Sequence, residues 1–250
     1  MKFCSEADPL TGWWRAEEWR ADVRYAAMVA RGVVDHLHLL VRKPHFPLQF
    51  LSNDNAFLST APNYFTQRTL LARSVMNDTQ PSHTQFILKP VYIALALLSL
   101  LGDRELPLAV SSNDTRVSLL AAGSWPKNGA FSATLLIVVN NETYNGDPKL
   151  QINFNLTLPL SAWDKNGIEP RYTIFVIDNH RSNPSAAWQQ AGAPTYPNRD
   201  LRSNMRAVQD SFRPVATAHV PESGSISLNL SLPSVALVQL CYQPHQIPDQ

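Results

Sequence analysis

Apolar residues in the first hundred positions recur mainly at the spacing of helices. Over Glu17–Leu40 they fall three and four residues apart with arginines between them, which predicts one long amphipathic helix. A second helix is predicted over Tyr64–Ser74. A third is predicted after Lys89, with Pro90 in its first turn and Gly102 as its C-terminal stop.

A short buried strand is predicted between the first two helices. The apolar stretch Phe46–Leu51 runs into the polar residues Ser52–Asn55, which is the pattern of a strand that ends in a loop. Helix, buried strand, polar loop and helix in succession are typical of the αβ units of a parallel sheet. In this part of the chain the pattern is incomplete.

Near residue 102 the period changes, and strand-like segments replace helical ones. The predicted strands are 116–122, 130–140, 150–160, 171–178, 225–232 and 234–242. Polar and apolar residues alternate almost strictly over Gln151–Leu158, and turn clusters such as Asn145–Pro148 separate the segments. This part is predicted to be an antiparallel β-sandwich, interrupted by one helix-like insertion at Asn198–Phe212.

Composition limits the classes of protein to which the chain can belong. It has 250 residues, 44% hydrophobic and 16% charged, which is the balance of a folded chain. The longest apolar run, around Val91–Leu101, falls short of the roughly 20 residues that span a membrane. A net charge of +1 gives no overall attraction to nucleic acid or to an anionic membrane, so an anionic partner must be held locally.

Cysteine and histidine content gives no sign of a metal site. Cys4 and Cys241 are the two cysteines, too few for a disulfide framework or a four-ligand zinc site. The seven histidines show no HExxH spacing. We therefore expect neither a metal nor another cofactor.

Five Asn-x-Ser/Thr sequons indicate the secretory pathway, because chance gives only one or two in a chain of this length. Their asparagines are Asn77, Asn113, Asn141, Asn155 and Asn229. The segment Met1–Ser5 is too short to be a signal peptide. If the chain is glycosylated, we expect its natural N-terminus to lie upstream.

Two carboxylates follow apolar segments and are candidates for chemistry. Glu6 comes after the apolar run Met1–Cys4, and a carboxylate at the carboxyl end of a parallel strand is where barrel enzymes place catalytic groups. The alternative is a solvated acid near the terminus, which the local sequence favours. Asp54 follows the predicted strand in the same way, and its alternative is a helix cap or an Asx-turn.

Aromatic and basic residues add a second group of candidates. Gly12 precedes Trp13 and Trp14, whose rings could support the apolar face of a sugar, although tandem tryptophans more often pack in a core. Arg68 lies within the second predicted helix, where an interior arginine needs a carboxylate partner, either Asp54 or a ligand. The alternative is an arginine on the surface.

Four motifs become specific when they are taken together. They are Glu6-Ala-Asp-Pro-Leu-Thr-Gly-Trp13, Trp19–Met28, Leu51–Ser59 and Gln67–Arg73. These motifs closely resemble glycoside hydrolase family 39, in particular its members that release iduronic acid. The resemblance is strong to about residue 101 and continues more loosely to Cys241.

The resemblance implies an α/β region followed by an all-β region. Residues 1–102 are expected to be the last strands and helices of a (β/α)8 TIM barrel, which is the catalytic domain. Residues 103–244 are expected to be an antiparallel β-sandwich domain, and 245–250 a tail. A complete barrel takes roughly 250 residues, so the expected barrel is partial and truncated on its N-terminal side.

The resemblance also implies a reaction and its residues. Glu6 matches the catalytic nucleophile at the end of barrel strand seven, while Gly12, Trp13, Asp54 and Arg68 match positions that contact the iduronate ring or its carboxylate. The implied reaction removes terminal α-L-iduronic acid from dermatan and heparan sulfate with retention and without a metal. The expected partner is thus a glycosaminoglycan, and the expected compartment is the lysosome or the secretory pathway.

Some family features have no counterpart here. Retaining glycosidases need a second carboxyl group about 5–5.5 Å from the nucleophile, and no acid/base glutamate precedes Glu6. The pair Asn141-Glu142 lies in a sequon after a predicted strand and is interpreted as a glycosylated loop. Cys241 matches a cysteine that pairs within a further fibronectin-like domain, absent here, so we expect an unpaired thiol.

We therefore expect the 250 residues alone to be nearly inactive. A non-catalytic β-sandwich module that binds a glycan or a partner remains the alternative from another class, and a structural protein without a ligand is a third. Turnover of a fluorogenic iduronide, and binding of heparin or dermatan fragments, distinguish the three.

Overall fold

The computed structural model describes most of the 250-residue chain. The described residues are 3–6, 15–42, 48–52, 64–124, 132–140, 150–158, 170–209 and 212–241, with the backbone alone at 3–6, 40–41 and 48–52. The predicted tail at 245–250 lies outside them.

The first long helix is capped by an aspartate. α1 (Val23–His36) begins after Asp22, whose side chain accepts a hydrogen bond from the backbone N–H of Arg24 at 2.8 Å. A π-helical stretch, Leu37–Arg42, continues α1, and a 3-10 turn, Glu18–Arg20, precedes it. The predicted long helix is confirmed, with its regular part starting at the cap.

The second helix, α2 (Pro90–Leu98), has its proline in the first turn as predicted. Its C-cap is Ser99, so the prediction that Gly102 stops the helix is wrong. A Cβ atom on Gly102 would lie 2.3 Å from the carbonyl carbon of Gly123. The close approach of these two backbones is what requires glycine at this position.

The predicted helix over Tyr64–Ser74 is wrong. Turns and bends, with one isolated bridge residue at Thr69, occupy residues 64–70, and β3 (Leu71–Met76) then pairs antiparallel with β4 (His83–Leu88). Alternate residues of β3 are buried, which is the period of a strand. The hairpin partner lies further along the chain, so local spacing did not reveal it.

A six-stranded antiparallel sheet occupies much of the second half of the chain. In spatial order its strands are β10 (Ala216–His219), β9 (Arg171–Asp178), β12 (Ser234–Cys241), β7 (Ser132–Val139), β6 (Val117–Ser124) and β5 (Arg104–Glu105). A second antiparallel sheet pairs β8 (Gln151–Thr157) with β11 (Ser225–Ser231). Every segment that was predicted as a strand after residue 102 overlaps one of these strands, which confirms antiparallel strands in this region.

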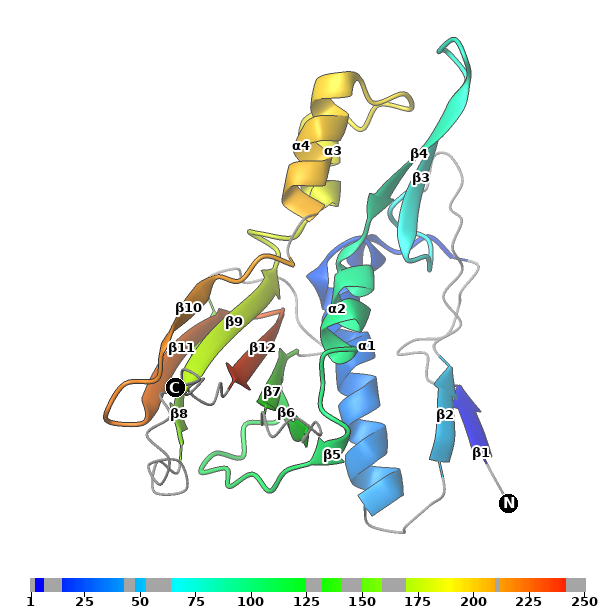
Figure 1. The fold of residues 1–250 in the computed structure, drawn as a ribbon. Coiled ribbons are helices and arrows are strands. Elements are labelled where there is room, and N and C mark those ends of the chain that lie inside the picture. Colours follow the sequence, from blue (N-terminus) through cyan, green and yellow to red (C-terminus); the bar gives the residue numbers. More distant parts are fainter. Residues whose placement is uncertain are drawn as a thin grey trace, which may run out of the picture.

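Side chains of the six-stranded sheet alternate between two apolar cores. On β12, Val235 and Leu237 pack with α1 and α2, whereas Val238 packs with β8 and β11. Figure 1 shows the two helices lying along one side of this sheet. The first core joins residues on both sides of position 102, so the predicted domains 1–102 and 103–244 share buried surface. The division into these domains stays a prediction.

Two helices, α3 (Pro184–Gln190) and α4 (Arg199–Gln209), form an insertion after β9. α4 confirms the helix predicted at Asn198–Phe212, and α3 was not predicted. The sequence does carry a signal for α3, because Asn183 followed by Pro184 is a common start of a helix. In the structure the Asn183 side chain accepts a hydrogen bond from the N–H of Ala186 at 3.1 Å.

A third apolar core joins this insertion to the β3–β4 hairpin. Trp188 of α3 and Met205 of α4 pack with Tyr64 and Phe65 and with Ile87 of β4. The Trp188 and Phe65 ring centroids are 5.4 Å apart. This core holds the turn segment at residues 64–70 against the insertion.

Candidate active site

The first two strands form a parallel pair that ends at Glu6. β1 (Phe3–Glu6) lies beside β2 (Leu48–Ser52), with Glu6 opposite Ser52 in the register. Figure 1 shows this pair on the side of α1 away from the large sheet. Glu6 thus ends a parallel strand, as the sequence predicted, and its catalytic role stays a prediction. The Glu6 side chain and the predicted site residues Gly12, Trp13 and Asp54 lie outside the described part of the chain.

Arg68 lies in the turn segment before β3, and its side chain is buried, with 7% exposed. The interpretations of Arg68 as a surface arginine and as a helix residue are therefore both wrong. The carbonyl of Thr66 in the same segment accepts a hydrogen bond from the N–H of Glu17 at 2.9 Å. The segment that carries Arg68 is thereby bonded to the stretch that follows Trp13 in the sequence.

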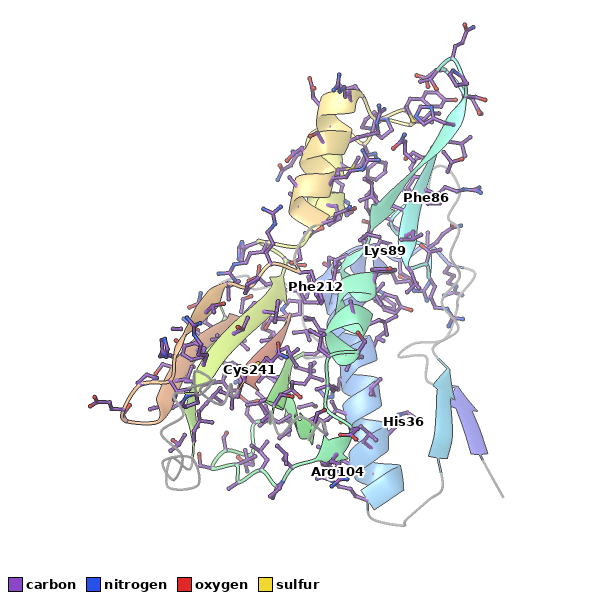
Figure 2. All side chains as sticks on the ribbon, in the orientation of Figure 1. His36, Phe86, Lys89, Arg104, Phe212 and Cys241 are labelled. Carbon is purple, nitrogen blue, oxygen red and sulfur yellow. The ribbon has the colours of Figure 1, made fainter. Side chains whose placement is uncertain are left out.

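Lys89 reaches this segment from the start of α2. Its Nζ donates a hydrogen bond to the carbonyl oxygen of Gln67 at 2.8 Å, and its backbone N–H donates to that of Leu70 at 3.1 Å. The side chain is 0% exposed. Figure 2 shows Lys89 where the hairpin meets α2.

Arg20 brings a second buried positive charge close to Lys89. It is 1% exposed, donates from Nη1 to the carbonyl oxygen of Arg15 at 2.6 Å, and holds its guanidinium 4.9 Å from the ring centre of Trp19. Burial, reinforced by the charge of Arg20, lowers the pKa of Lys89 from 10.5 to about 7.

We call Arg20, Arg68, Lys89 and the turn segment 64–70 the basic junction. Among the described residues, these three are the arginine and lysine side chains that are buried. The sequence analysis missed Arg20 and Lys89, although Lys89 stands alone between two apolar segments. A positive, water-excluded environment can bind an anionic group strongly, because the charges are screened little.

A shared cap ties the start of α1, which follows Arg20 in the sequence, to the end of β9 in the large sheet. Asn179, which follows β9, accepts a hydrogen bond from the N–H of Val23 at 3.0 Å, and its Nδ2 lies 3.5 Å from a carboxylate oxygen of Asp22. Burial raises the pKa of Asp22, and its interactions with Arg24 and Asn179 oppose this rise. Two side chains from distant segments thus complete the start of α1.

Four of the five sequon asparagines lie in the described residues and are exposed; they are Asn77, Asn113, Asn155 and Asn229. Asn155 and Asn229 lie on adjacent strands, β8 and β11, and bond to cross-strand side chains. Asn141 lies outside the described part. Exposure is what glycosylation requires, and the modification of these sites stays a prediction.

Cys241 ends β12, is exposed, and forms no disulfide with a residue whose side chain is described. Among the described residues, no group of three His, Cys, Asp or Glu side chains is placed to hold a metal ion. No described helix has the length and apolar character needed to cross a bilayer.

Comparison with known proteins assigns the chain to a class of enzymes. Residues 2–227 match the family described as Glycosyl hydrolases family 39. The chain therefore belongs to glycosyl hydrolase family 39, a family of glycosidases.

Within that family its relatives include α-L-iduronidases. The human α-L-iduronidase is 38% identical over 264 aligned residues, which cover 98% of this chain and 39% of the human protein. The dog enzyme is 39% identical, with 97% of this chain and 38% of the relative covered. The Drosophila melanogaster enzyme is 36% identical over 82% of this chain and 32% of its own length. The chain thus spans about two fifths of the length of the two mammalian relatives.

Solved structures share the fold at low identity. A bacterial orthologue of human α-L-iduronidase superposes with a TM-score of 0.77 at 20% identity, covering 99% of this chain and 43% of its own. A monomeric β-xylosidase from Caulobacter crescentus superposes with a TM-score of 0.64 at 15% identity, covering 96% and 45%. At these identities the likeness concerns the fold.

Proposed function

We propose that this chain supplies the last part of a (β/α)8 barrel and the β-sandwich domain of a retaining α-L-iduronidase. The observation that carries the proposal is the parallel pairing of β1 with β2 that ends at Glu6, in a chain 38% identical to human α-L-iduronidase. Active sites of such barrels lie at the carboxyl ends of the strands. Residues 1–102 would form the barrel part, 103–244 the sandwich and 245–250 a tail.

Glu6 is the proposed nucleophile. Its carboxylate oxygen bonds to the anomeric carbon while the glycosidic C–O bond breaks and the leaving oxygen takes a proton from a second carboxyl group. Water then attacks the same carbon, gives one proton back to that group and releases Glu6, so configuration is retained overall. The second group is not assigned within this chain.

Gly12, Trp13, Asp54 and Arg68 are proposed to hold the sugar. An iduronate carries its own carboxylate, which would repel the Glu6 carboxylate unless cationic or N–H donors compensate for it. Arg68 suits this task, because a guanidinium keeps its charge when buried and can bind a carboxylate through two hydrogen bonds. The basic junction supports this assignment with two further buried positive charges.

The proposed substrate is the terminal α-L-iduronic acid of dermatan and heparan sulfate, a glycosaminoglycan partner. The five sequons support passage through the secretory pathway, with the lysosome as the proposed destination. No metal or other cofactor enters the proposed reaction.

A chimaeric enzyme tests the proposal most directly. Human α-L-iduronidase with its aligned region replaced by this chain should hydrolyse a fluorogenic α-L-iduronide, whereas the 250 residues alone should show little turnover. Glu6→Gln should lower kcat of the chimaera about 10³-fold or more, because no covalent intermediate can form.

Exposed Glu222 provides the matched control, since Glu222→Gln makes the same chemical change away from the site. In Glu6→Gly, added azide should restore cleavage of the aryl iduronide and yield a glycosyl azide of inverted configuration. If Glu6→Gln is as active as Glu222→Gln, Glu6 is not the nucleophile.

A further inference from the structure

We propose that Lys89 is a positioning residue that holds the segment carrying Arg68, and thereby makes the sugar site selective for a carboxylate-bearing sugar. This inference rests on the proposed function, because it takes Arg68 to bind the sugar carboxylate. Lys89 itself is not assigned a contact with the sugar.

Lys89 anchors the chain on both sides of Arg68. Its Nζ bonds to the carbonyl of Gln67, immediately before Arg68, at 2.8 Å. Its backbone N–H bonds to the carbonyl of Leu70, two residues after Arg68, at 3.1 Å. Arg68 thus lies between two carbonyl groups that the same residue fixes.

The rest of the segment is fixed as well. The N–H of Thr69 bonds to the Gln67 carbonyl at 2.9 Å, and the Thr69 hydroxyl bonds to the carbonyl of Leu71 at 2.9 Å. From the other side, Glu17 holds the carbonyl of Thr66. The Lys89 side chain is a contribution to this frame that a single substitution removes without changing the turn sequence.

Electrostatics argue that Lys89 is not kept for stability alone. Lysine is almost never fully buried unless it is paired, and the described hydrogen-bond partner of its Nζ is a neutral carbonyl. The nearby charge of Arg20 repels it, so below about pH 7 the folded chain holds the ammonium at a free-energy cost. A methionine of similar length would fill the space without that cost, which indicates that the ammonium group has a positional role.

A binding comparison on the chimaeric enzyme, in its Glu6→Gln form so that the ligands are not turned over, tests the inference. Methyl α-L-iduronide and methyl α-L-idopyranoside differ only in the carboxylate, and calorimetric titration with each gives an affinity ratio. This form should prefer the iduronide about tenfold or more. Arg68→Met should abolish this preference, and Lys89→Met should reduce it at least fivefold with little change for the neutral sugar.

The ratio separates positioning from general destabilisation, because both affinities fall alike when less of the chain is folded. Leu136→Ala is the matched control: Leu136 is 0% exposed in the large sheet, and its loss should lower stability while leaving the ratio unchanged. Lys89→Arg, which keeps a charged donor, should retain more of the preference than Lys89→Met.

Hydrogen exchange gives a second measurement that needs no ligand. The Thr69 amide should exchange at least tenfold faster in Lys89→Met than in the wild type, whereas the amides of β12, which report global unfolding, should not exchange faster. If Thr69 exchange and the affinity ratio do not change in Lys89→Met, the inference is wrong even if Arg68 binds the sugar. If the Glu6→Gln chimaera has no preference for the iduronide, the proposed sugar site fails, whereas the exchange of Thr69 still decides whether Lys89 fixes the segment.

Discussion

The six-stranded sheet and the basic junction are buried to a similar degree but are filled by opposite kinds of side chain. At the centre of the sheet, Leu136, Ile137 and Leu237 are each 0% exposed. In the junction, Arg20 and Lys89 are 1% and 0% exposed. Buried aliphatic groups favour folding by roughly 25 cal/mol per Å², whereas buried charges oppose it. The sheet therefore stabilises the folded chain, whereas burying the charges of the junction lowers the free energy of unfolding.

The largest expected effect on stability lies in the sheet. Leu237→Ala should lower the free energy of unfolding by about 2–5 kcal/mol, because it removes buried methyl groups and leaves a cavity in the core shared with α1 and α2. Urea denaturation measures the change, with Gln239→Ala on the same strand as the control. A loss below about 1 kcal/mol would mean that the sheet is not the main source of stability.

The basic junction should differ from the sheet in making the free energy of unfolding depend on pH. The pKa of Lys89 is lowered from 10.5 to about 7, so between these values the unfolded chain binds a proton that the folded chain has released. Stability should therefore rise with pH across this window, by at most about 1.4 kcal/mol per pH unit, and the contribution should be constant and unfavourable below about pH 7.

Lys89→Met should remove this part of the slope, whereas Leu237→Ala should shift the whole curve without changing the slope. Urea denaturation from pH 6 to 10 compares the three proteins. Equal slopes in the wild type and Lys89→Met would contradict the lowered pKa.

The smallest effect is expected at the cap between the two regions. Asp22→Ala should lower the free energy of unfolding by about 1 kcal/mol, because the Arg24 N–H loses its acceptor. Asp22→Asn keeps a hydrogen-bond acceptor for this N–H. It also removes a buried carboxylate whose raised pKa shows that its charge is costly to bury, so the variant should retain most of the stability at neutral pH. Thermal unfolding at pH 7 measures both, and equal losses would show that the charge, not the acceptor, matters.

The local sequence pattern correctly predicted the elements that show one clear periodicity along their own length. The amphipathic spacing over residues 17–40 correctly predicted a helix, α1, and the apolar run at residues 171–178 correctly predicted a strand, β9. Each of these segments keeps one pattern along its length. The segment 64–74 failed because β4 supplies the hydrogen bonds that make part of it a strand. No local feature of residues 64–74 encodes that partner.

The candidate site was also predicted in part from local sequence and in part not. Glu6 was predicted at the end of a parallel strand, and the register with β2 agrees. Its role, and those of Gly12, Trp13, Asp54 and Arg68, came from motif likeness rather than from spacing. Arg20 and Lys89 were missed because lysine and arginine are usually exposed, and their burial depends on segments far apart in the chain.

The core shared by α1, α2 and the six-stranded sheet has a practical consequence for anyone who expresses this protein. A gene divided at codon 102 would yield two polypeptides, each presenting to water the aliphatic surface that normally meets the other. Such pieces should precipitate when produced separately and become soluble when co-expressed. The chain is therefore better handled as one unit than as a pair of modules.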